Sequence, residues 1–262
     1  MTSKSDSQYT DGIVSSMEEI FGKGFLSPGG SMEVVRAFRN IQVAGMSVLD
    51  WGCGLGGATM ALVRDLDAAK VVGVDIDAGN LSRAAGNVAD AGLQDRISLE
   101  HVEPGPLPLP AGSLDIVFTQ AAMCHIEDKA AVFADFSRVL RPGGVVLCVD
   151  WMKGDATSDA YTDWDAILRR EGLDFTFTTA GHHIDAMTSA GFEDVSVRNE
   201  SKTLLTLARD CIGHIEHTGR SSLLKALGSE GYDRFLNRSV ARALALADGG
   251  LIFGHLTGRK PS

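Results

Sequence analysis

The sequence of 262 residues has no long apolar run, no cluster of basic residues and only four cysteines, and each absence excludes a class of protein. No segment is long and apolar enough to cross a bilayer, and the polar first eleven residues do not resemble a secretory signal. We therefore expect a cytoplasmic protein with no membrane contact. The widely spaced cysteines predict reduced thiols and no zinc site. A net charge of −10 argues against a nucleic-acid partner, which requires a basic surface.

A buried strand, a glycine-rich turn and a helix are predicted one after another from residue 46. Asp50 closes the strand, and Gly52, Gly54 and Gly57 fit the G-x-G-x-x-G spacing typical of nucleotide-binding folds. A dinucleotide would bring its pyrophosphate close to the Asp50 carboxylate. S-adenosylmethionine carries an ammonium and a sulfonium instead, so the sequence favours this cofactor over NAD.

Strand and helix patterns alternate along the chain, which predicts an α/β fold with a Rossmann-like, doubly wound and mostly parallel sheet of seven strands. Two helices are expected before the first strand, the second capped by Ser31. Two more, near 204–228 and 232–247, are expected to form a lid before the last strand. We expect a single domain in which 1–45 covers the cofactor, 46–151 binds it, and 152–262 completes the sheet and supplies the lid. Strands are predicted at 46–49, 70–75, 97–102, 114–118, 145–149, 193–198 and 250–257.

Polar or aromatic residues fall at the carboxyl ends of the predicted parallel strands: Asp50, Asp75, Glu103, Gln120 and Trp151. In parallel α/β sheets, ligands bind outside the carboxyl ends of the strands. Asp75 ends the second strand, where ribose hydroxyls are bound in such folds. The sequence therefore predicts a ligand site along this edge of the sheet.

The motifs resemble the class I S-adenosylmethionine-dependent methyltransferases at 48–57, 73–75, 114–117 and 140–144. A narrower resemblance, to the phosphoethanolamine (phosphobase) methyltransferases, covers nearly the whole chain. It is carried by residues 8–11, by the loop 20–30 and by His125. This resemblance implies an enzyme in which Tyr9 and His125 pair as a catalytic lock over the substrate. It also implies that Leu26 and Ser27 help to cover the cofactor.

The resemblance and the predicted edge of the sheet together define an expected cofactor site, with Glu103 in place of the aspartate that usually faces the adenine amino group. No metal is expected. The expected cofactor contacts are Leu26, Ser27, Asp50, Gly52, Gly54, Asp75, Ile76, Glu103, Pro104 and Gln120.

The sequence departs from the phosphoethanolamine methyltransferases where those enzymes hold their substrate. Gln120–Ala121 stands where that family has an Arg-Asp pair, and Trp151 stands where it has a tyrosine. The family's phosphate-holding residues do not align with the segment around Leu173 and Phe175. A small-molecule acceptor other than phosphoethanolamine is therefore expected. The expected substrate contacts are Tyr9, Ala121, His125 and Trp151.

Methyl transfer to an amine needs a group that removes a proton, and a histidine with an ordinary pKa of about 6.5 suits this task. For His125 the alternative is a structural role beside the following helix, for Tyr9 simple exposure, and for Trp151 core packing. Oxygen, sulfur or carbon acceptors stay open. Two other functions also stay open, an NAD-dependent oxidoreductase and a non-catalytic cofactor-binding protein. The protein is expected to be a monomer or a homodimer. The histidine pairs 182–183 and 214–217 could bind metal, but the sequence favours solvated helix faces for them.

Overall fold

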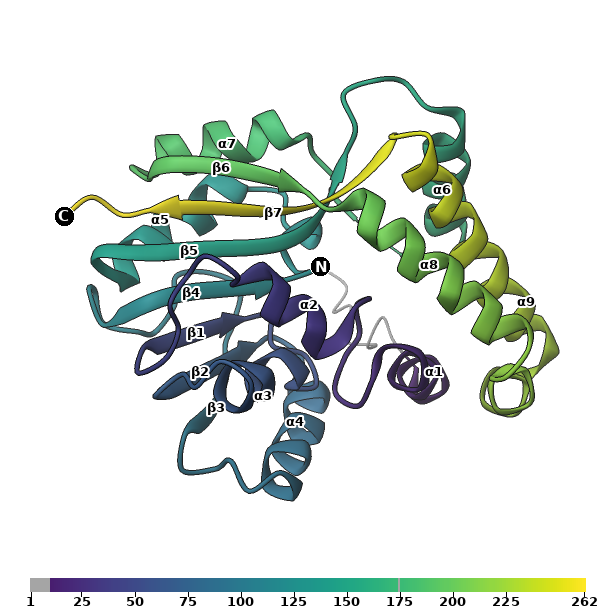
Figure 1. The fold of residues 1–262 in the computed structure, drawn as a ribbon, viewed down its shortest axis with the longest axis horizontal. Helices are drawn as coiled ribbons and strands as arrows, with labels where there is room; N and C mark the ends of the chain where they lie inside the picture. Colours follow the sequence, from purple (N-terminus) through teal and green to yellow (C-terminus); the bar gives the residue numbers. More distant parts are fainter. Residues whose placement is uncertain (1–9, 174) are drawn as a thin grey trace.

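The structure is a computed structural model that describes residues 10–173 and 175–262. A seven-stranded sheet with the order β3-β2-β1-β4-β5-β7-β6 forms its centre (Figure 1). Strands β1 to β5 pair in parallel, whereas β7 is antiparallel to both of its neighbours. The predicted Rossmann-like, mostly parallel sheet is therefore confirmed. The strands are β1 Ser47–Trp51, β2 Lys70–Asp75, β3 Ile97–His101, β4 Leu114–Gln120, β5 Leu140–Lys153, β6 Glu193–Asn199 and β7 Leu251–Arg259.

Helices cover both faces of this sheet. Residues of α2, α3 and α4 share one buried apolar cluster, and residues of α5 and α7 share another. Successive residues of the central strands alternate between the two clusters: Val48 packs on the first side and Leu49 on the second. The helices are α1 Asp11–Phe21, α2 Gly30–Ala37, α3 Gly57–Arg64, α4 Ala78–Asp90, α5 Lys129–Val139, α6 Asp159–Arg170, α7 Ala180–Ser189, α8 Ser201–Glu216 and α9 Arg220–Ala247.

Helices α6, α8 and α9 form a separate helical layer beyond the carboxyl ends of the parallel strands (Figure 1). Helix α9 packs on α6 and α8, and α1 packs on α9. Helices α8 and α9 come between β6 and β7 in the sequence, so the predicted pair of helices before the last strand is confirmed. Among the described residues, no helix is long and apolar enough to span a membrane.

Three local predictions are wrong. The expected helix over 204–228 is divided, because α8 ends at Glu216 and α9 begins at Arg220; its expected end at Gly228 does coincide with an interruption of the helical backbone, where φ is 70°. Strand β5 begins at Leu140, because Leu140 already pairs with Leu114 of β4. Ser31 does not cap α2: the capping position is Gly29, which has no side-chain hydrogen bond to offer.

Candidate functional site

A cavity of about 1640 Å³ opens at the carboxyl ends of the parallel strands, between the loop before α2 and the helices α6 and α9. Small-molecule pockets are commonly about 300–1000 Å³, so this cavity has room for two ligands side by side. Every site residue predicted from the sequence that lies in the described part of the chain lines the cavity. Tyr9 lies outside the described residues, so its pairing with His125 stays a prediction.

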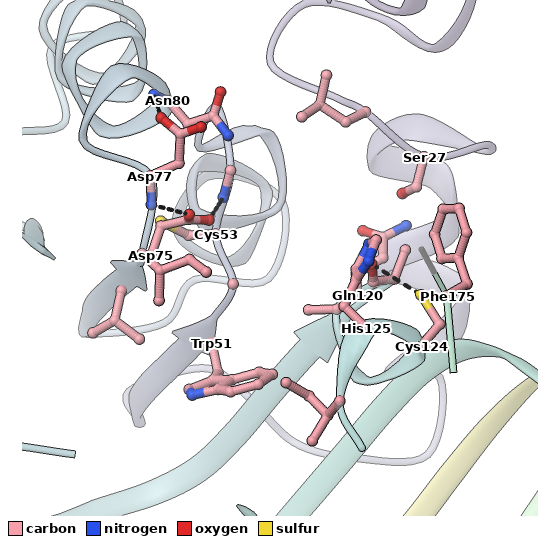
Figure 2. Close-up of a pocket in the computed structure, with 18 of the residues that line it drawn as sticks. Ser27, Trp51, Cys53, Asp75, Asp77, Asn80, Gln120, Cys124, His125 and Phe175 are labelled. Atoms are coloured by element: carbon pink, nitrogen blue, oxygen red, sulfur yellow. Dashed lines mark hydrogen bonds between the residues drawn. The ribbon is translucent and has the colours of Figure 1, made fainter. Parts of the chain in front are cut away.

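Asp75 organises the first end of the cavity, which we call the acidic end. Its carboxylate accepts hydrogen bonds from the backbone N–H of Gly54 at 2.8 Å and of Asp77 at 2.9 Å. Burial raises the pKa of Asp75 above its usual value. In this way one carboxylate holds the β1–α3 turn against the β2–α4 turn, as Figure 2 shows. The same carboxylate lines the cavity, where it can accept hydrogen bonds from hydroxyl groups.

Ile76 is 63% exposed, although large aliphatic side chains are usually buried. It follows Asp75 directly and lines the cavity together with Glu103 and Pro104, which come from the loop after β3. The carbonyl of Ile76 lies 3.1 Å from Nε2 of His101, which ties this residue to the end of β3. An apolar surface beside a carboxylate is suited to a planar base attached to a ribose.

Asp50 lies deeper, with 1% of its surface exposed. Its carboxylate accepts a hydrogen bond of 2.6 Å from the Thr59 hydroxyl on α3. Burial raises the pKa of Asp50 to about 7, and the nearby charge of Asp75 adds to this effect. A nearby cation would stabilise the ionised form, as the prediction for the ammonium of the cofactor requires.

The loop that carries Leu26 and Ser27 lies on the glycine turn after β1 because two backbones come close together. Gly57 donates its N–H to the carbonyl of Gly24 at 3.0 Å, and a Cβ on Gly57 would lie 2.5 Å from that oxygen. Glycine is therefore required at 57. A Cβ on Gly54 would lie 3.6 Å from Leu26, so the loop lies over the turn.

The other end of the cavity, which we call the aromatic end, is built around His125 in the short 3₁₀ turn η1 (Met123–His125). The chain turns here because Ala121, directly after β4, has a φ of +54°, a strained value for a residue with a Cβ. The ring of His125 lies beside that of Phe175 (Figure 2), with the ring centroids 4.5 Å apart. The Phe175 ring in turn stacks on that of Phe177, with centroids 5.1 Å apart. Gln120 has a buried Nε2 without a hydrogen-bond partner in the described part of the chain.

Two arginines of α9 also line this end, although no motif or spacing in the sequence selects them. Arg238 pairs with Glu171. Arg242 forms no ion pair with any residue in 10–173 or 175–262, and its guanidinium lies 5.4 Å from the ring centroid of Trp151. Burial lowers the pKa of Arg242 to about 10, so it stays charged at neutral pH. It is thus a cation without a counter-charge among the described residues, on the wall of a cavity.

Two further expectations can be compared with the structure. Trp151 is mostly buried against Phe253, with ring centroids 4.9 Å apart, and it also lines the cavity, so both of its proposed roles fit. His183 does not lie on a solvated helix face: it is fully buried at the start of α7, where burial lowers its pKa to about 4. His214 instead contacts Glu19 at 3.3 Å.

Comparison with known proteins gives one family match, described as "Methyltransferase domain", over residues 48–144. Phosphoethanolamine N-methyltransferase 3 of Arabidopsis thaliana is 25% identical over 248 residues, which are 92% of this chain and 48% of that protein. Sterol 24-C-methyltransferase ERG6B of Gibberella zeae is 31% identical over 156 residues, which are 57% of this chain and 40% of that protein. The chain thus spans about half the length, or less, of these curated relatives.

Solved structures share the fold. Haemonchus contortus phosphoethanolamine N-methyltransferase 2, in complex with phosphomonomethylethanolamine and S-adenosylhomocysteine, superposes with a TM-score of 0.86 at 23% identity. The match covers 98% of this chain and 59% of that one. The [4+2]-cyclase SpnF superposes with a TM-score of 0.69 at 18% identity, over 97% of both chains. A protein named for a different reaction shares this fold, so the reaction has to be argued from the site.

Proposed function

We propose that the chain is a class I methyltransferase related to the phosphobase methyltransferases, and that it transfers a methyl group from S-adenosylmethionine to the nitrogen of a small amine that also bears an acidic group. The observation that carries this proposal is the pairing of two unlike ends in one cavity. The acidic end offers carboxylates to hydroxyls and an ammonium, whereas the aromatic end offers an imidazole and a free guanidinium. The acidic chain and the concave site support a small-molecule partner rather than a nucleic acid.

The residues of the acidic end fit the cofactor part by part. Asp75 would accept the ribose hydroxyls, Ile76 would pack on the adenine, and Asp50 would face the ammonium. Leu26 and Ser27 would cover the bound cofactor from the loop before α2. When bound, S-adenosylmethionine supplies an electrophilic methyl group on a sulfonium, and the chain has to orient the acceptor and manage its proton.

A pH titration tests the role of Asp50, whose carboxyl is protonated below its raised pKa of about 7. As the pH falls from 7 to 5 the ammonium of S-adenosylhomocysteine stays charged, but its counter-charge is lost. We expect the Kd to rise by up to about tenfold per pH unit in calorimetry, and Asp50→Asn to remove most of this dependence. A Kd of the folded wild type that stays constant over this range would contradict the assignment.

We assign His125 as the general base that removes a proton from the acceptor. An ammonium has no lone pair, so it must be deprotonated before its nitrogen can attack the methyl carbon, and an imidazole at the edge of the sheet is suited to take this proton. The contact with Phe175 restricts the orientation of the imidazole. Tyr9, from the family resemblance, would complete the lock over the acceptor. Alignment of nitrogen, methyl carbon and sulfur then supplies much of the rate, because proximity is worth several kcal/mol.

Arg242 supports an acidic group on the acceptor, since a carboxylate or phosphate would pair with its guanidinium. The aromatic rings of Phe175, Phe177 and Trp164 support an amine that already carries methyl groups, because a methylated ammonium binds well to aromatic faces. Ala121 stands where the phosphoethanolamine methyltransferases have an aspartate. This departure supports an acceptor other than phosphoethanolamine itself.

A panel of acceptors tests the proposal, with release of S-adenosylhomocysteine as the readout. Matched compounds should include primary, secondary and tertiary amines with a carboxylate, with a phosphate or with neither, together with phenols and thiols. We expect turnover only on amines that carry an acidic group. Turnover confined to phenols or thiols would overturn nitrogen as the acceptor. Tight binding of NADH without any turnover would favour an oxidoreductase.

Arg242→Gln is expected to raise the KM for the acceptor by about 10- to 150-fold, because a hydrogen bond to a charged group is worth about 1.5–3 kcal/mol. The affinity for S-adenosylhomocysteine should stay within about twofold. Arg234→Gln is the matched control, since Arg234 lies on the same helix but pairs with Glu230 at the surface. Equal KM values for the two variants would show that Arg242 does not hold the acceptor.

A further inference from the structure

Two oppositely charged side chains are buried behind the turn that carries His125. Asp150, near the carboxyl end of β5, is 0% exposed, and Lys129, the first residue of α5, is 1% exposed. Neither lines the cavity, so neither can touch a ligand held there. Burial of a charge is unfavourable unless the charge is paired and hydrogen-bonded, so the contacts of these two groups indicate what they stabilise.

Asp150 holds the turn from the side of the sheet. One carboxylate oxygen accepts a hydrogen bond of 3.3 Å from the N–H of Cys124, and the other accepts one of 2.7 Å from the N–H of Trp151. Cys124 is the central residue of η1 and immediately precedes His125. No side chain caps this turn, and its residues follow the strained Ala121. The carboxylate therefore supplies an acceptor that the turn itself lacks.

Lys129 holds the same turn from the other side. Its Nζ donates to the carbonyl of Ile126 at 2.6 Å and to the carbonyl of Thr176 at 2.9 Å. Thr176 in turn donates its N–H to the carbonyl of Cys124 at 2.6 Å. The turn and the segment after α6 are thereby joined at two points, directly beside the ring contact between His125 and Phe175.

We propose that Asp150 and Lys129 are positioning residues for methyl transfer, which fix the His125 imidazole and the Phe175 ring in one orientation at the edge of the sheet. This inference rests on the proposed role of His125. The carboxylate fixes the turn relative to β5, and the ammonium fixes the segment with Phe175 relative to the turn. The raised pKa of Asp150, about 6 because of its burial, still leaves the carboxyl mostly ionised at neutral pH.

Asp150→Asn tests this inference, because it removes the charge and keeps the shape. A displacement of a catalytic group by about 1 Å can lower the rate about 10²-fold, so we expect kcat to fall by about 10- to 100-fold. The KM for the acceptor and the Kd for S-adenosylhomocysteine should change by less than about threefold. Lys129→Met should act in the same direction, and Lys129→Arg should restore part of the rate. Glu200→Gln is the control, because Glu200 is also a buried carboxylate but lies at the start of α8, outside the cavity.

A double-mutant cycle separates positioning from a general structural effect. If Asp150 acts through His125, then Asp150→Asn should cost little further rate in the His125→Ala background. Equal losses in both backgrounds would overturn the positioning role and leave the proposed function intact. If His125→Ala itself has no effect, the proposed base is wrong instead.

The ¹⁵N imidazole spectrum of the protein provides a second readout that requires no acceptor and remains available if one variant does not fold. We expect the His125 signal to shift or broaden in Asp150→Asn and in Lys129→Met, and to stay unchanged in Glu200→Gln. An unchanged His125 signal in folded Asp150→Asn and Lys129→Met would overturn the inference.

Discussion

His125→Ala is expected to lower turnover by about 10²- to 10⁴-fold, the usual range for the loss of a general acid or base. The physical reason is that a protonated amine cannot attack the methyl carbon. Among the described residues, no other imidazole lines the aromatic end of the cavity. The affinity for S-adenosylhomocysteine should change little, because the cofactor contacts that we propose lie at the acidic end. Measurement of kcat together with calorimetric Kd checks both halves of this expectation.

The matched control is His217→Ala, which removes an exposed histidine from the end of α8. A pH–rate profile sharpens the test: a general base requires the acidic limb of the wild type to disappear in His125→Ala. If the wild type and the variant share the same limb and similar turnover, His125 has only a structural role.

Asp75→Ala is expected to weaken binding of S-adenosylhomocysteine by about 10²- to 10⁴-fold. A carboxylate that accepts two ribose hydroxyls contributes two charge-assisted hydrogen bonds, each worth about 1.5–3 kcal/mol. The same carboxylate also accepts the N–H groups of Gly54 and Asp77, so its loss loosens both turns that bound the site. Isothermal titration calorimetry measures the effect directly.

Asp75→Asn distinguishes these two contributions, because the amide retains one acceptor oxygen and the shape of the side chain. Asp95→Asn, which changes an exposed residue in the loop before β3, is the control for the loss of a negative charge. Thermal unfolding of each variant shows whether the turns remain folded. Unchanged cofactor affinity in a folded Asp75→Ala variant would contradict the assignment of the acidic end as the cofactor site.

The sheet and the acidic end could be predicted because their signals are local. Asp50, Gly54 and Asp75 lie in short motifs in which strand, turn and helix follow one another, and parallel strands bring their carboxyl ends to one edge. Those constraints place the residues together without knowledge of any contact between distant segments. For this reason the residues predicted for the acidic end line one cavity.

The remainder depends on contacts between segments far apart in the sequence. Lys129 reaches the carbonyl of Thr176, 47 residues away, and no pattern around either residue indicates this contact. Arg242 has the spacing of an ordinary basic residue on an amphipathic helix, and only the packing of α9 on α6 and α8 brings it to the cavity. The break between α8 and α9 could not be predicted, because one glycine such as Gly219 within a helical pattern is often tolerated.

The division of the cavity into two ends has a consequence for how such a chain can change over time. The acidic end comes from residues 24–107, whereas most of the aromatic end comes from α6, α9 and the segment between α6 and α7. Substitutions in these later segments can therefore change which molecule is accepted without altering the proposed cofactor contacts. A laboratory library restricted to the later segments would explore new acceptors while every member retained the same methyl donor.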